Sequence, residues 1–92
     1  MDRTKFDTAL SHLGKPAYQA ENVAIYNIDC IDAMKVLPNS LVDLTVTSPP
    51  YNIGKEYEDI VEINDYVAWC TEWISQIHRV TKCNGSFWLN IG

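Results

Sequence analysis

Four consecutive residues, Ser48, Pro49, Pro50 and Tyr51, have types and an order that suit them to chemistry. A proline fixes its own φ angle and pushes the residue before it into extended geometry, so the backbone through Ser48 and Pro49 is nearly rigid. Prolines donate no N–H, and the segment therefore presents acceptors, its carbonyls and the Ser48 hydroxyl, in a fixed direction. Tyr51 adds a flat aromatic face. This proline corner, residues 48–51, suits a planar ligand that carries an amino group.

The elements that must position the proline corner follow from the spacing of apolar residues and from turn signals. The predicted elements are a helix within residues 4–14, a strand at 22–28, a helix at 29–38, a strand at 41–47, a long helix after residue 64 and a strand at 86–91. The β-α-β-loop-α-β order favours an α/β fold with a mainly parallel sheet and right-handed crossovers. In such sheets ligands bind beyond the C-terminal ends of the strands, and the proline corner lies at such an end.

The long helix carries the strongest periodic pattern in the chain. Asn64 or Asp65 is predicted to cap its start, and Asn84–Gly85 to stop it. Arg79 and Lys82 suit its last turn, where cations are favoured without any further function. Its apolar stripe is predicted to be core and comprises Tyr66, Trp69, Cys70, Trp73, Ile74, Ile77 and Val80.

The sequence TSPPYN resembles the S/D/N-P-P-Y motif of the DNA methyltransferases that act on exocyclic amines, adenine N6 or cytosine N4. The resemblance extends upstream over IYNIDCIDAMKVLPNSLVDLTV and downstream over YVAWCTEWISQIHRVTKCNGSFWLNIG. It covers about residues 23–92. It implies a partial Rossmann-like fold and the donor S-adenosylmethionine.

The resemblance also assigns roles to single residues. Ser48 Oγ and the Pro49 carbonyl would accept the two hydrogens of the target amine, Pro50 would hold the corner rigid, and Tyr51 would stack on a base flipped out of the duplex. Serine at the first motif position favours cytosine N4 over adenine N6, although some adenine enzymes also carry serine.

Two further residues, Asp29 and Cys30, would lie near the adenine end of the cofactor according to the same resemblance. The bottom-up alternatives stay open: Asp29 is a plausible N-cap of the helix at 29–38, and Cys30 a small buried apolar residue.

The expected domain organisation is an N-terminal segment with a short helix at residues 1–22 and the N-terminal catalytic half of a methyltransferase at 23–92. A glycine-rich cofactor turn and a target-recognition region are absent from these residues. In the family's permuted class both follow the catalytic motif. The strand at 23–28 would then lie at a sheet edge, separated from the motif strand by two strands. We therefore expect a gap in the sheet, exposed edges that favour self-association, and no activity of the isolated chain.

Composition limits the other possibilities. The net charge is −5, from seven Lys+Arg against twelve Asp+Glu, so double-stranded DNA would be bound only as part of a larger enzyme. Three cysteines without C-x-x-C spacing argue against disulfides and metal and fit a reducing, cytoplasmic setting. No window predicts a membrane span. The alternative functions are a methyltransferase of protein glutamine or RNA, an interaction module, or a non-catalytic remnant.

Overall fold

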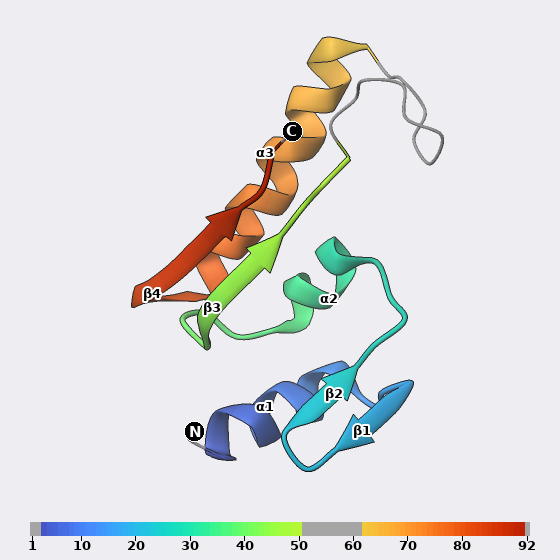
Figure 1. Ribbon diagram of the computed structural model, residues 1–92, viewed down its shortest axis with the longest axis vertical. Coiled ribbons are helices and arrows are strands. Elements are labelled where there is room, and N and C mark those ends of the chain that lie inside the picture. Colours follow the sequence, from blue (N-terminus) through green and yellow to red (C-terminus); the bar gives the residue numbers. More distant parts are fainter. Residues whose placement is uncertain (1–2, 51–61, 92) are drawn as a thin grey trace.

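The structure is a computed structural model that describes residues 3–50 and 62–91 (Figure 1). Tyr51 and the acidic stretch after it lie outside the described residues. The elements are α1 (Arg3–Leu13), β1 (Tyr18–Ala20), β2 (Val23–Ile25), α2 (Cys30–Val36), β3 (Val42–Thr47), α3 (Ile63–Val80) and β4 (Thr81–Leu89). The predicted mixed α/β class, with a small parallel sheet, is confirmed.

The N-terminal part holds α1 and an antiparallel hairpin of β1 and β2, in which Tyr18 pairs with Ile25 and Ala20 with Val23. The predicted helix is confirmed, and Gly14 follows it at φ 82°. The hairpin was not predicted, and β2 is shorter than the expected strand at 22–28 because it pairs only along the short β1. The side chain of Arg3 reaches back to the Glu21 carbonyl and ties α1 to the hairpin turn.

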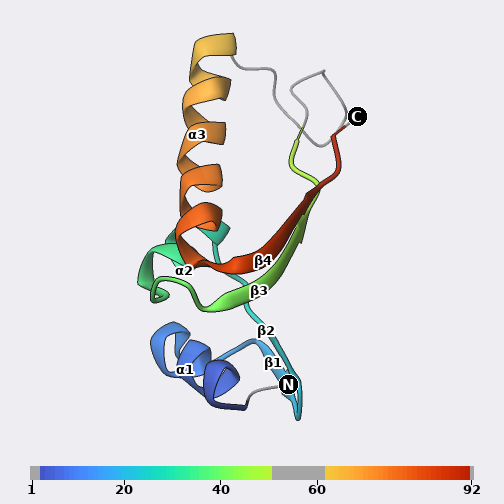
Figure 2. The ribbon, with the colours of Figure 1, turned by 90° about the vertical axis from the view of Figure 1, so that its left-hand side faces the viewer.

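β3 and β4 form a separate parallel sheet, joined through α3. Within the described residues β2 pairs with β1 and not with β3. Figures 1 and 2 show α2 between the N-terminal part and the unit of α3, β3 and β4. One ion pair links the two parts, because the Asp43 carboxylate of β3 lies 3.2 Å from Lys5 Nζ of α1. The same carboxylate lies 3.3 Å from Lys82 Nζ of β4. The hydrogen bond from Lys5, followed by that from Lys82, lowers the pKa of Asp43.

Both predicted ends of the long helix were wrong. Glu62 is the N-cap of α3, and its carboxylate accepts hydrogen bonds from the backbone N–H groups of Asn64 and Asp65 at 2.9 and 3.3 Å. At the other end α3 stops at Val80 and continues directly into β4.

The turn residues expected to stop the helix lie instead inside an irregular part of β4. Val42 pairs with Thr81 and Leu44 with Ser86, so five steps along β4 match two along β3. Gly85 is required there by close approach: a Cβ would lie 2.7 Å from Thr81 Cγ2 and 2.9 Å from the Asp43 carbonyl oxygen. The regular ladder then runs from Ser86 to Leu89, close to the predicted strand.

The core is small and lies where α2 packs on α3. Its buried apolar residues in the described part of the chain are Ile31, Trp73, Ile77 and Val80, with Met34, Trp69 and Cys70 packed against them. Most of the predicted stripe is thereby confirmed as core. Ile74 is a correction, because it is 41% exposed. The β3–β4 sheet also carries exposed apolar side chains, including Val46 and Trp88.

Candidate functional site

A cavity of about 390 Å³ lies at the C-terminal end of β3. Among the residues that line it are Cys30 at the start of α2 and the described part of the proline corner, Ser48, Pro49 and Pro50. Cys30 and Ser48 are 18 positions apart in the sequence, and they meet at one site because α2 packs on α3. The volume falls within the usual range for small-molecule sites.

The strand β3 positions the proline corner. Its last residue, Thr47, is held by a hydrogen bond from the backbone N–H of Asn90 to the Thr47 carbonyl at 3.0 Å. Past this point Ser48 is exposed and Pro49 is half-buried. The Pro50 carbonyl accepts a hydrogen bond from Tyr66 Oη at 2.5 Å, which attaches the corner to the first turn of α3. The corner is thus anchored on both sides of Ser48 and Pro49.

Asp29 does not line the cavity. Its Oδ1 accepts hydrogen bonds from the backbone N–H groups of Ile31 and Asp32 at 2.9 and 3.2 Å. The predicted N-cap role is confirmed, and a cap of this kind contributes about 1 kcal/mol to helix stability. Through the cap, Asp29 fixes the start of α2 and with it the position of Cys30.

The Cys30 side chain is a neutral group in this site. Desolvation by the surrounding protein, followed by the negative charge of Asp29, raises the pKa of the Cys30 thiol above its ordinary value. Nucleophilic cysteines need the opposite shift, since the thiolate is the reactive form. Cys30 is exposed, so the alternative of a small buried residue is wrong. It lines the cavity as a small polarizable group.

The cavity is also lined by an aromatic wall formed by Trp69 and Trp73, and by Met34. The ring centroids of Trp69 and Trp73 are 5.9 Å apart in an edge-on arrangement. The sequence pattern identified both tryptophans as core residues and missed that they also face the site, because a helical stripe does not show where the core ends. Trp73 Nε1 is buried without a hydrogen-bond partner among the described residues.

Arg79 holds the C-terminal end of α2. Its guanidinium donates to the carbonyls of Met34 and Leu37 and to Asn39 Oδ1, at 2.5, 2.8 and 2.8 Å. The sequence placed Arg79 in the last turn of α3 only for its charge. The structure adds a specific contact to the end of α2, which no local pattern signals.

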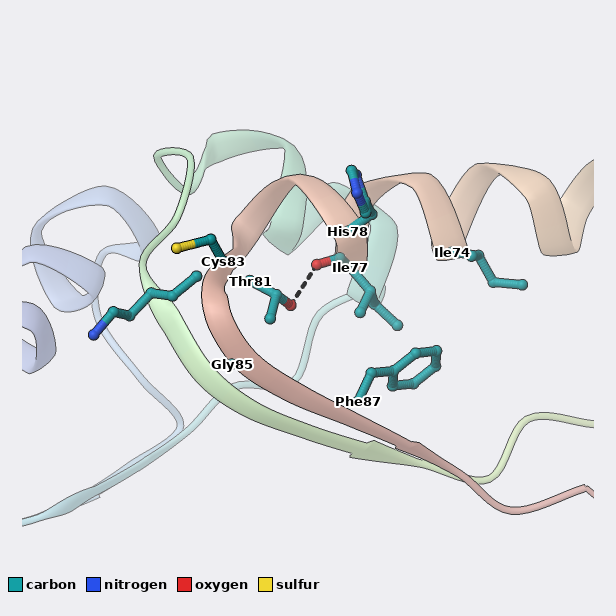
Figure 3. A pocket seen from close by; sticks show the side chains of 8 residues that line it. Ile74, Ile77, His78, Thr81, Cys83, Gly85 and Phe87 are labelled. Atoms are coloured by element: carbon teal, nitrogen blue, oxygen red, sulfur yellow. Dashed lines mark hydrogen bonds between the residues drawn. The ribbon is translucent and has the colours of Figure 1, made fainter.

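A second cavity, of about 350 Å³, lies between α3 and β4 and contains none of the predicted site residues. Figure 3 shows Ile74, Ile77 and Phe87 around it, with the Thr81 hydroxyl donating to the Ile77 carbonyl. The first cavity is the candidate site, because predicted site residues line it and not the second one.

In the described ranges no cluster of three or more His, Cys, Asp or Glu side chains could hold a metal ion. A bilayer-spanning segment is likewise absent from the helices of residues 3–50 and 62–91.

Comparison with known proteins gives one family and a set of relatives. The profile of a family described as "DNA methylase", for N6 and N4 methyltransferases, matches residues 42–92. Type II methyltransferase M.ScaI of Streptomyces caespitosus is 51% identical over 80 residues, 87% of this chain and 26% of the relative. Type II methyltransferase M.BglII of Bacillus subtilis is 46% identical over 68 residues, 74% of this chain and 19% of the relative.

A third relative has a name that specifies its base. DNA adenine methyltransferase YhdJ of Escherichia coli K12 is 35% identical over 72 residues, 75% of this chain and 24% of the relative. The chain thus spans about a quarter or less of the length of each of these three relatives. No solved structure gives a significant match.

Proposed function

Because this chain belongs to the DNA methylase family whose profile matches residues 42–92, we propose that it is the catalytic part of a site-specific DNA methyltransferase. The reaction would place a methyl group on an exocyclic amino group of a base flipped out of double-stranded DNA. The observation that carries the proposal is that Ser48, Pro49, Pro50 and Cys30 line one cavity.

The proposed chemistry depends on acceptors and not on a strong base. The lone pair of an exocyclic amine is delocalised into its ring, which makes the nitrogen a poor nucleophile. Ser48 Oγ and the Pro49 carbonyl would accept its two hydrogens, draw the nitrogen toward sp³ geometry and free the lone pair. A rigid corner favours this step, since acceptors that are already oriented need no rearrangement during the reaction. Tyr51, which lies outside the described residues, would stack on the base.

The cofactor would be S-adenosylmethionine, and the cavity fits part of it. Cys30 lines the cavity as a neutral group beside the apolar Met34 and the aromatic wall, an environment suited to a flat heterocycle. The Asp29 carboxylate would lie at the edge, where it caps α2. When bound, S-adenosylmethionine supplies an electrophilic methyl group on a positively charged sulfur.

The proposed target atom is cytosine N4, because serine leads the motif. Adenine N6 is the second candidate, favoured by the 35% identity to a relative named as a DNA adenine methyltransferase. Both amines present the same two hydrogens to Ser48 and Pro49, so the remainder of the pocket selects between the bases.

The proposed organisation follows the permuted class, with residues 1–22 as an N-terminal segment and 23–92 as the catalytic half. A cofactor turn and a target-recognition region would come from elsewhere in the enzyme. Val46 and Trp88 of the β3–β4 sheet are 69% and 68% exposed. These exposed apolar side chains support the further proposal that the isolated chain self-associates.

A chimera tests the function directly. This chain would replace the matching segment of M.ScaI, the relative 51% identical over 80 residues, and transfer of labelled methyl groups from S-adenosylmethionine to DNA would be measured. We expect an active chimera, and Ser48→Ala should lower kcat about a hundredfold, as loss of one oriented hydrogen-bonding group does at other active sites. Ser75→Ala, at an exposed serine of α3, is the matched control and should leave kcat unchanged.

Mass spectrometry of the digested DNA would identify N4-methylcytosine or N6-methyladenine and so decide between the two bases. A folded chimera without transfer activity, or full activity of Ser48→Ala, would refute the proposed function.

A further inference from the structure

Tyr66 makes a contact with the proline corner that the motif itself does not include. Its hydroxyl donates to the Pro50 carbonyl at 2.5 Å, across 16 positions of sequence. The donor comes from α3 and the acceptor from the segment that follows β3, so the bond joins two elements, and its acceptor residue lines the cavity.

The Tyr66 side chain is itself held in place. Its backbone N–H donates to the Glu62 carbonyl at 3.0 Å, at the capped start of α3. Its ring lies 5.9 Å from that of Trp69, and Trp69 lies 5.9 Å from Trp73, which is only 4% exposed. A continuous row of aromatic rings thus connects the hydroxyl to the core. These contacts restrict the side-chain torsions of Tyr66, so its hydroxyl is held in one direction toward its acceptor.

Of the φ and ψ torsions of the two prolines, one has no covalent constraint. Their rings fix both φ angles, and Pro50 restricts the ψ of Pro49 because it follows it. The ψ of Pro50 has no such restriction, and this angle sets the direction of the Pro50 carbonyl and of the chain as it leaves the corner. The bond from Tyr66 acts on that carbonyl.

We propose that Tyr66 is a positioning residue for methyl transfer. It fixes the orientation of the proline corner by holding the Pro50 carbonyl. This inference rests on the proposed function. It assigns to α3 a part in holding the acceptors in line with the target amine, in addition to its part in the core. A purely structural bond would stabilise the fold without changing the rate of transfer.

A matched pair of variants separates these two roles in the M.ScaI chimera. Tyr66→Phe removes the hydroxyl and retains the ring against Trp69. Tyr26→Phe is the control, since Tyr26 Oη also donates to a backbone carbonyl, that of Gly14, at 2.6 Å. Its acceptor Gly14 does not line the cavity, whereas Pro50, the acceptor of Tyr66, does. Each variant would be assayed for kcat, for the KM of S-adenosylmethionine and for the melting temperature.

Tyr66→Phe should lower kcat about threefold to tenfold, the range that corresponds to one hydrogen bond, with little change in the cofactor KM. Tyr26→Phe should lower the melting temperature by a similar amount to Tyr66→Phe and leave kcat unchanged. An unchanged kcat in Tyr66→Phe, or an equal loss in both variants, would overturn the inference and leave the proposed function intact. A folded but inactive unmutated chimera would refute the proposed function, and the inference would fall with it.

Discussion

Replacing Arg79 with methionine tests how α2 is held against α3 and hence how Cys30 is kept at the cavity. Methionine retains most of the apolar length of the side chain and removes the guanidinium. Three bonds to the end of α2 and the segment after it are lost, those to the carbonyls of Met34 and Leu37 and to Asn39 Oδ1.

The expected loss follows from the number and setting of these bonds. Buried hydrogen bonds from charged donors contribute about 1.5–3 kcal/mol each, but Arg79 is only half-buried, and solvent screening lowers this to about 1 kcal/mol each. The variant should therefore lose about 3 kcal/mol of unfolding free energy. For a domain of this size that corresponds to a fall in melting temperature of roughly 12–24 °C.

The assay is thermal and urea unfolding followed by circular dichroism, with Lys35→Met as the control. Lys35 also links α2 to α3, through an ion pair to Glu72 at 3.2 Å, but both side chains are about half exposed. Removing it changes the net charge equally and should cost less than about 1 kcal/mol. An equal loss of unfolding free energy in the two variants would show that the positive charge alone, and not the hydrogen bonds of the guanidinium, holds α2.

Two further predictions concern β4 and the cavity. Gly85→Ala should lower the unfolding free energy by about 1–3 kcal/mol, because the new Cβ would lie 2.7 Å from Thr81 Cγ2 and 2.9 Å from a backbone oxygen; urea unfolding that matches the unmutated chain would contradict the close approach. The substitutions C70S and C83S leave Cys30 as the only thiol. It should react slowly with iodoacetamide at neutral pH, and its rate should rise at a higher pH than is usual for thiols, because desolvation and Asp29 raise its pKa. Asp29→Asn retains an N-cap without the charge and should lower the Cys30 pKa, so a pH–rate curve unmoved by this substitution would count against the assigned cause.

Local chemistry made several features readable before the fold was known. The proline corner could be recognised because two consecutive prolines restrict the backbone wherever they occur. The start of α2 could be placed because Asp29 caps its own helix through bonds to Ile31 and Asp32, two and three residues away. The apolar stripe of α3 likewise reports a burial pattern that repeats within a single element.

Features that depend on distant partners were missed or misplaced. Asn84–Gly85 resembles a helix stop, yet the glycine is needed for the approach of β4 to Asp43, about forty positions earlier. The strand β1 is too short to give a periodic signal, so neither β1 nor its pairing with β2 could be predicted.

The sequence by itself therefore determined the rigid backbone of the proline corner, the order of the main elements and the family. The tertiary structure decided which groups meet: Cys30 with Ser48 across one cavity, Arg79 with the end of α2, and Tyr66 with the Pro50 carbonyl. The physical reason is range. Torsional restriction and capping act over a few residues, whereas a cavity wall or a bond across 16 positions exists only once packing has fixed the relative placement of helices and strands.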